Sequence, residues 1–246
     1  MWLESPCREH DNAGKHRAGR LTGQHDLGRT LPVMRVLMIA PPGAGKGTQG
    51  ALIAAHFDVP HIATGDLLRD HVARHTDLGQ AVRRLLERGE LVPDNIVLDM
   101  VREAVVAAKA ASGGYVLDGI PRSMTQARAL YLIGLELEMT AHVALHLNAD
   151  DRELTRRLLA RALLEGRSDD TEEVIRQRLN LYHGVTHPIV AWYGERGILL
   201  SVDAMRPVEE VSRDILTSLE ALDRTQPPAL ELDSLAVAFG HVRSVP

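Results

Sequence analysis

Short apolar runs alternate along this chain with longer segments in which apolar residues recur at the helical period. The apolar runs are brief and predict buried β-strands. They cover 33–39, 115–117, 142–147 and 198–202. The periodic segments predict helices over about 48–56, 78–86, 96–106, 151–164 and 171–182. Strands that alternate with helices predict an α/β fold, with a parallel sheet covered by helices on both faces.

The two ends of the chain lack these patterns. Residues 1–33 are rich in Gly, His, Arg and Asp and show neither a helical nor a strand period, and residues 225–246 lack strong periodicity. We therefore expect a disordered N-terminal extension over 1–33, one folded domain over 34–224, and a disordered C-terminal tail over 225–246.

Composition indicates a globular protein with an aliphatic core. Of the 246 residues, 45% are hydrophobic and only 3% are aromatic, so Leu, Val, Ile and Ala must fill the core. The formal net charge is −5, and nothing predicts a general attraction to nucleic acid. Any phosphate groups would have to be bound by locally placed Arg and Lys.

The cysteine count and the hydropathy limit the cellular locations to be expected for this protein. The single cysteine, Cys7, cannot form an internal disulfide or a multi-cysteine zinc site. No apolar run approaches the ~18 residues of a membrane-spanning helix, and the N-terminus lacks the apolar segment of a secretory signal. We expect a cytoplasmic protein that has no membrane partner.

A glycine-rich turn joins the first predicted strand to a helix. It contains Gly43, Ala44, Gly45, Lys46, Gly47 and Thr48. Glycines let several backbone N–H groups point inward, and the helix N-terminus adds partial positive charge. Lys46 can then reach the β- and γ-phosphates of a nucleoside triphosphate. The turn therefore predicts a phosphate-binding loop.

Two positions depart from the strict pattern of such loops. Ala40 stands where the first glycine is usual, and Gly47 stands where a Ser or Thr usually follows the lysine. If Ala40 needed a positive φ, it would cost about 1 kcal/mol or more. Without the hydroxyl, Mg²⁺ would depend on phosphate oxygens, water and a carboxylate from elsewhere. Asp118 is the candidate, because it ends a predicted strand at the ligand-binding edge of the sheet.

Further short motifs follow the loop in order. They are Thr64-Gly65-Asp66-Leu67-Leu68-Arg69, Gly89-Glu90-Leu91-Val92-Pro93-Asp94, Leu117-Asp118-Gly119-Ile120-Pro121-Arg122 with Gln126, Arg167-Ser168-Asp169-Asp170-Thr171-Glu172-Glu173, and Arg178-Leu179-Asn180-Leu181-Tyr182. With these motifs, the chain resembles the adenylate kinases of the nucleoside monophosphate kinase family, in their short-lid form. The resemblance covers about 34–222.

The resemblance implies a three-layer P-loop NTPase fold around a five-stranded parallel sheet. A helical insert over about 63–92 would bind the nucleoside monophosphate, and a short lid would cover about 160–170. The implied reaction is the reversible, Mg²⁺-dependent transfer of the terminal phosphoryl group of ATP to AMP, giving two ADP for adenine nucleotide homeostasis. The implied enzyme is a monomer. Only five residues separate Arg161 from Arg167 and none is cysteine, so no structural zinc is expected.

The resemblance also implies roles for individual residues. The catalytic residues would be Lys46, Asp118, Arg122, Arg167 and Arg178, with Asp118 holding Mg²⁺ through water. ATP would be bound by Gly43, Ala44, Gly45, Lys46, Gly47, Thr48, Arg157, Arg161 and Arg206. AMP would be bound by Thr64, Arg69, Glu90, Leu91, Val92, Gly119, Ile120, Pro121, Arg122, Gln126, Arg167 and Arg178. Many positive side chains suit this chemistry, because the transferring phosphoryl group spreads negative charge over its oxygens.

Some of these residues also fit simpler structural roles. Arg157 and Arg161 are four residues apart on a predicted helix and are compatible with a solvated face. Asp169 and Asp170 are interpreted as capping carboxylates of the helix that follows.

Two functional alternatives stay open on the sequence alone. One is a UMP/CMP kinase, although Thr64 favours AMP as the acceptor. The other is a nucleotide-binding paralogue with impaired catalysis, which Ala40 permits.

Overall fold

The computed structural model describes residues 32–165 and 170–222, whose strands form one parallel sheet. The strands are β1 (Arg35–Ile39), β2 (His61–Ala63), β3 (Tyr115–Asp118), β4 (Val143–Asn148) and β5 (Leu199–Asp203). They pair in parallel in the order β2-β3-β1-β4-β5. The predicted α/β fold with a five-stranded parallel sheet is confirmed.

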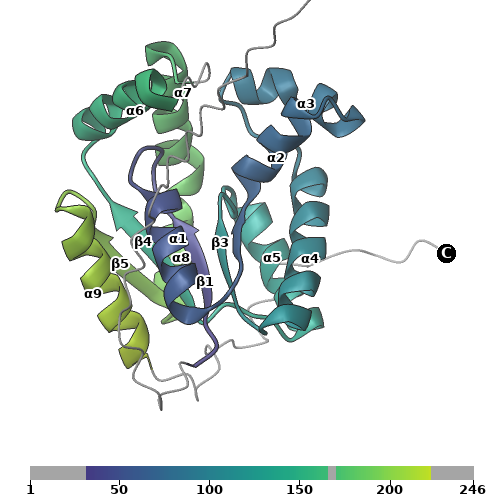
Figure 1. Cartoon of the computed structure of the whole chain (residues 1–246), viewed down its shortest axis with the longest axis vertical. Coiled ribbons are helices and arrows are strands. Elements are labelled where there is room, and N and C mark those ends of the chain that lie inside the picture. The colour runs from purple at the N-terminus through teal and green to yellow at the C-terminus, as the bar shows by residue number, and fades with distance from the viewer. Residues whose placement is uncertain (1–31, 166–169, 223–246) are drawn as a thin grey trace, which may run out of the picture. The chain divides into compact units, whose positions relative to one another are not determined.

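Helices connect these strands (Figure 1). They are α1 (Lys46–Phe57), α2 (Thr64–Ala73), α3 (Asp77–Glu87), α4 (Asp94–Ala111), α5 (Met124–Leu137), α6 (Asp151–Glu165), α7 (Glu172–Leu181), α8 (Pro188–Glu195) and α9 (Val208–Ala221), with a π-helical turn η1 (Tyr182–Thr186) between α7 and α8. The apolar pattern predicted α1, α3, α4, α6 and α7. It gave no clear signal for β2, α2, α5, α8 or α9.

The sheet is buried between two layers of helices. Side chains that alternate along a strand point to opposite faces. Leu37 and Ile39 of β1 therefore pack into one core cluster with apolar residues of α4, α5 and α8. On the other face α1 and α9 pack against each other, α1 next to β3 and α9 next to β5. Burial on both faces explains why β1, β3 and β4 are nearly continuous apolar runs.

The strand register places Asp118 and the segments after three strands at one edge of the sheet. Met38 pairs with Asp118, and Ala63 pairs with Asp118 from the other side. The segments that follow β1, β2 and β3 therefore start side by side at the carboxyl edge, where open α/β sheets bind ligands. In Figure 1, α2 and α3 lie to one side of this edge, and α6 and α7 lie to the other.

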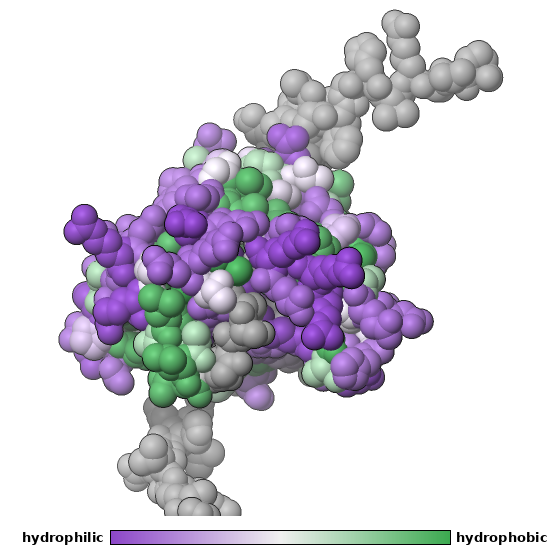
Figure 2. Space-filling model, turned by 90° about the horizontal axis from the view of Figure 1, so that it is seen from above, coloured by the Kyte–Doolittle hydropathy of each residue, from purple (hydrophilic) through white to green (hydrophobic). Residues whose placement is uncertain are grey.

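The surface around this end is mostly hydrophilic. Figure 2 looks onto it and shows hydrophobic residues only in separate patches. Leu163 and Leu164, near the end of α6, are 88% and 86% exposed. No helix in the described part of the chain has the length and apolar character needed to cross a membrane.

Residues 1–31, 166–169 and 223–246 lie outside the described ranges. The disorder predicted at the two ends therefore stays a prediction, and so do the domain boundaries. The predicted lid over about 160–170 falls partly outside as well, together with Arg167.

Candidate active site

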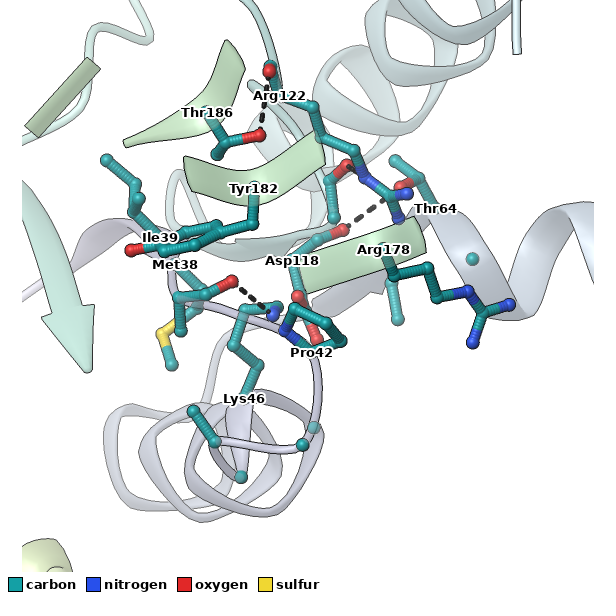
Figure 3. A pocket seen from close by; sticks show the side chains of 18 of the residues that line it. Met38, Ile39, Pro42, Lys46, Thr64, Asp118, Arg122, Arg178, Tyr182 and Thr186 are labelled. Carbon is teal, nitrogen blue, oxygen red and sulfur yellow. Dashed lines mark hydrogen bonds between the residues drawn. The ribbon is translucent and has the colours of Figure 1, made fainter. Parts of the chain in front are cut away.

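A cavity of about 760 Å³ opens at the carboxyl edge of the sheet. Its walls come from the turn after β1, the start of α2, the segment after α3, the segment after β3, and α6, α7 and the start of α9. Figure 3 shows side chains from several of these elements around the same space. Parts of the chain that lie far apart in sequence therefore meet here.

The glycine-rich turn forms one wall of the cavity. Gly43 and Gly45 have φ of 84° and 89°, the left-handed region that glycine tolerates best. A Cβ on Gly43 would also lie 2.9 Å from Leu158 Cγ of α6, so the turn can approach α6 only without a side chain there. Gly45 precedes the first residue of α1, which is Lys46. The predicted strand, turn and helix are all present.

Lys46 folds back over this turn. Its ammonium group donates hydrogen bonds to the carbonyl oxygens of Ala40 at 2.8 Å and Pro41 at 3.2 Å. Although the residue as a whole is half-buried, protein encloses the amine, and this desolvation lowers the pKa of Lys46 to about 8. The Asp118 carboxylate opposes the shift, and the guanidiniums of Arg122 and Arg161 add to it. The lysine thus stands close to one negative group and two positive groups.

Ala40 fits its position without backbone strain. Among the described residues other than glycine, a positive φ occurs at Asp58, His75 and Glu138 and not at Ala40. Its side chain is buried, and its carbonyl holds Lys46. The sequence departure at this position therefore does not carry the cost that a positive φ would impose.

The segment after β3 forms the wall beside α2. Thr64, the first residue of α2, is 1% exposed and donates from Oγ1 to the Asp118 carbonyl at 3.2 Å. Gly119 has φ 89°, and a Cβ there would lie 2.3 Å from Thr64 Oγ1. Its carbonyl accepts a hydrogen bond from Arg122 Nε at 2.7 Å. Arg69 lines the same wall and pairs with Asp66.

Arg122 stands among several charged groups. Desolvation lowers the pKa of its guanidinium, the Asp118 carboxylate opposes this shift, and the guanidiniums of Arg178 and Arg69 add to it. Thr186 of η1 donates to the Arg122 carbonyl at 2.9 Å, as Figure 3 shows. A basic residue is thus anchored from two sides within a positively charged wall.

A buried carboxylate joins two arginines on α6 and α7. The Asp170 side chain has no exposed surface. Its Oδ2 accepts hydrogen bonds from Arg161 Nε at 2.9 Å and Nη2 at 2.6 Å, and its Oδ1 accepts one from Arg178 Nη1 at 2.8 Å. The cap of α7 is instead Thr171, whose side chain accepts from the Val174 N–H. The interpretation of Asp170 as a capping carboxylate is therefore wrong.

The ATP side of the prediction concerns Arg157 and Arg206. Arg157 of α6 donates to the Ala204 carbonyl at 3.0 Å and pairs with Glu153 at 2.8 Å. Arg206 pairs with Asp214 of α9 at 2.7 Å. Both arginines line the cavity next to the glycine-rich turn.

Most of the predicted site residues line this one cavity. They are Gly43, Ala44, Gly45, Lys46, Gly47, Thr48, Thr64, Arg69, Glu90, Leu91, Val92, Asp118, Gly119, Pro121, Arg122, Gln126, Arg157, Arg161, Arg178 and Arg206. The side chain of Ile120 is instead fully buried in the core cluster. Arg167 lies outside the described residues.

Sequence reasoning gave no role to Tyr182, Thr186 or His146, and none in the site to Asp170. Tyr182 and Thr186 line the cavity from η1, a π-helical turn of the kind that is frequent at functional sites. His146 contacts the Tyr182 hydroxyl through Nε2 at 2.9 Å. Burial lowers the pKa of His146 to about 4, so this imidazole is neutral near pH 7. The helical pattern over 171–182 gave no indication that the helix changes from α to π at Tyr182.

Comparison with known proteins agrees with this geometry. The family model for adenylate kinase matches residues 38–198. The adenylate kinase of Thermobifida fusca is 43% identical over 188 residues, which are 76% of this chain and 99% of that protein. The chain belongs to the adenylate kinase family. An adenylate kinase transfers a phosphoryl group from ATP to AMP and yields two ADP, so ATP and AMP are the substrates.

Other adenylate kinases are similarly close. The protein of Kocuria rhizophila is 44% identical over 186 residues, which are 76% of this chain and 98% of the relative. The protein of Thermus thermophilus is 42% identical over 184 residues, which are 75% of this chain and 96% of the relative. The matched part of this chain thus corresponds to almost the whole of each relative, and it favours AMP over the pyrimidine acceptors considered above.

Proposed function

We propose that the adenylate kinase reaction takes place in this cavity, with the glycine-rich turn and Lys46 on the triphosphate of ATP. The observation that carries the proposal is the convergence of Lys46, Asp118, Arg122 and Arg178 on one space, from α1, from β3 and the segment after it, and from α7. Phosphoryl transfer needs little covalent help from the protein, and positioning and charge stabilisation supply most of the catalysis. The positive groups of Lys46, Arg122 and Arg178 suit a phosphoryl group that passes from one nucleotide to the other, because negative charge spreads over its oxygens.

On the donor side, ATP would lie along the turn from Gly43 to Thr48. Arg157, Arg161 and Arg206 would bind it from α6 and from the segment before α9. The backbone N–H groups of the turn and the N-terminus of α1 provide the positive field that phosphates need.

On the acceptor side, Arg69 and Arg122 would bind the α-phosphate of AMP. A guanidinium presents parallel N–H donors that match phosphate oxygens. Thr64, the segment from Glu90 to Val92, and the backbone from Gly119 to Pro121 would enclose the ribose and base, with Gln126 at the adenine edge. Arg178 would reach the transferring group, and Arg167 keeps the same proposed role.

The residues present fit a magnesium ion that arrives with ATP. The Asp118 carboxylate lies in the cavity beside Lys46, and Thr48 lines the same cavity. Mg²⁺ in nucleotide sites usually keeps several waters and takes one or two carboxylates plus phosphate oxygens. Asp118 would hold it through water, and the ion would neutralise charge on the β- and γ-phosphates. No group of three or more potential ligands for a structural metal occurs among the described His, Cys, Asp and Glu residues.

The remaining proposals concern the setting of the enzyme. In line with what the resemblance implies, they are that the enzyme works in the cytoplasm and that it is a monomer.

The test measures the formation of ADP from ATP and AMP with Mg²⁺, in a coupled assay on the full chain. Lys46→Ala should lower kcat by about 100-fold or more, because the lysine acts on charge that develops in the transition state. Lys109→Ala is the matched control, since Lys109 lies on α4 outside the cavity and binds the Leu137 carbonyl. Turnover of Lys46→Ala close to that of the control would refute the assignment. The same assay with CMP, UMP and GMP as acceptors tests the preference for AMP.

A further inference from the structure

The side-chain amide of Gln126 is held on both of its polar atoms. Gln126 lies in the first turn of α5, is 2% exposed, and still lines the cavity. Its Oε1 accepts a hydrogen bond from the Arg122 backbone N–H at 2.7 Å. Its Nε2 donates one to Asp94 Oδ1 at 2.7 Å. Asp94 is the first residue of α4 and does not itself line the cavity.

These two partners fix which way the amide faces. A backbone N–H can only donate, and a carboxylate can only accept. Turning the amide by 180° would place Nε2 against the Arg122 N–H and Oε1 against the Asp94 carboxylate. Both contacts would then be repulsive, and two partly buried hydrogen bonds would be lost. The orientation therefore follows from the chemistry of the neighbours and does not depend on telling oxygen from nitrogen.

The amide keeps one donor and one acceptor for a ligand. Nε2 has a second hydrogen, and Oε1 has a second lone pair. Adenine presents an acceptor at N1 and a donor at its 6-amino group, which match this pair. Hypoxanthine presents a donor at N1 and an acceptor at O6, the reverse pattern. In the same pose, hypoxanthine would meet both atoms of a fixed amide with the wrong polarity, but a freely turning amide could adapt to it.

We infer that Asp94 is a specificity-determining positioning residue, which holds the Gln126 amide in the orientation that accepts AMP and rejects 6-oxopurine nucleotides such as IMP. This inference rests on the proposed contact between Gln126 and the adenine edge. Buried polar groups that a wrong base leaves mismatched give strong discrimination, and a flexible group would forfeit it.

Asp94 also has a simpler role as an acidic residue in the first turn of a helix. A carboxylate there interacts favourably with the helix dipole and contributes about 0.3–1 kcal/mol. The two roles separate on substitution. Asp94→Asn removes the charge but can retain an oxygen that accepts from Gln126 Nε2, whereas Asp94→Ala removes both.

The experiment measures kcat/KM for AMP and for IMP with Mg·ATP, in the wild type, Asp94→Ala, Asp94→Asn, Gln126→Ala and the double variant Asp94→Ala/Gln126→Ala. Asp77→Ala is the matched control, because Asp77 is the first residue of α3 and does not line the cavity. Asp94→Ala should lower the AMP-to-IMP ratio by about tenfold, the usual effect of losing one hydrogen bond. Asp94→Asn and Asp77→Ala should stay within about threefold of the wild type, and KM for ATP should not change.

The double variant should show the same ratio as Gln126→Ala, because Asp94 acts only through that amide. If Gln126→Ala lowers the ratio and Asp94→Ala does not, the inference is overturned while the proposed adenine contact stands. If Gln126→Ala leaves the ratio unchanged, the proposed contact itself fails. An equal loss in Asp94→Asn and Asp94→Ala would point to the helix charge and overturn the inference. If Asp94→Ala does not fold, the test is Asp94→Asn: an AMP-to-IMP ratio as low as that of Gln126→Ala overturns the inference.

Discussion

Replacing Asp170 with asparagine should both destabilise the enzyme and slow it. The carboxylate is fully buried and accepts three hydrogen bonds from two arginines, whose side chains are 31% and 19% exposed. Removing one partner of a buried ion pair typically costs 3–5 kcal/mol. Because the guanidiniums reach solvent and asparagine keeps one oxygen, about 2–4 kcal/mol is the expected loss.

Thermal unfolding without nucleotide measures this loss. For 150–250 residues, 1 kcal/mol shifts Tm by about 2–4 °C, so the Asp170→Asn variant should melt about 5–15 °C below the wild type. Asp70→Asn is the matched control: its carboxylate pairs with Arg74 on the surface of α2, at 58% exposure. Such pairs contribute about 0.3–0.5 kcal/mol, so the control should melt within about 2 °C of the wild type.

Turnover should fall along with stability. Without the shared carboxylate, Arg161 and Arg178 keep like charges close together and lose the group that aligns them. A misplacement of about 1 Å in a catalytic group can cost about 100-fold in rate, so a loss of this order is expected at saturating substrate. A Tm within 2 °C of the control, together with unchanged kcat, would refute the view that Asp170 organises these arginines.

Two other predictions concern the loop and the AMP wall. Because burial lowers the pKa of Lys46 to about 8, the free enzyme should lose this cation as pH rises through 8, so kcat/KM for ATP should fall there. Bound phosphates favour the charged form, so kcat should fall only at higher pH; a kcat/KM that stays flat up to pH 9.5 would count against the shift. Gly119→Ala should raise KM for AMP by about tenfold or more with little change in KM for ATP, because a Cβ at φ 89° would lie 2.3 Å from Thr64 Oγ1. Equal effects on the two substrates would contradict this placement.

The sequence predicts those parts of the molecule whose structure is determined by residues that are neighbours in the chain. The glycine-rich turn, its lysine and the helix after it are contiguous, and their geometry follows from residue types alone. Strands β1, β3 and β4 were visible because burial on both faces makes them nearly continuous apolar runs. Strand β5 is only half-buried, but it still begins with a short apolar run. Strand β2 has only three residues, His61–Ala63, too few for a pattern. Helix α5 buries the polar Gln126 together with small and apolar residues, which blurs its apolar period.

The rest of the site depends on long-range partners that no local pattern specifies. An Asp before a Thr at the start of a helix is compatible with either residue as the cap. Only the tertiary structure shows that Thr171 caps α7 and that Asp170 accepts a hydrogen bond from Arg161 of α6. The contact between Gln126 and Asp94 likewise spans 32 residues. The resemblance indicated that Gln126 meets a base, but not what holds it.

The surplus of positive charge around Lys46 has a consequence for how long the protein survives in a cell. Within the described residues, no ion pair involves Lys46 or Arg122, so folding brings these cations together with only the nearby Asp118 carboxylate to offset them. In the proposed site, nucleotides would supply the missing anions and bind only the folded state, which would add RT ln(1 + [L]/Kd) to its stability. A molecule deprived of adenylates would therefore unfold and be degraded sooner, and its abundance would follow the nucleotide pool that it serves.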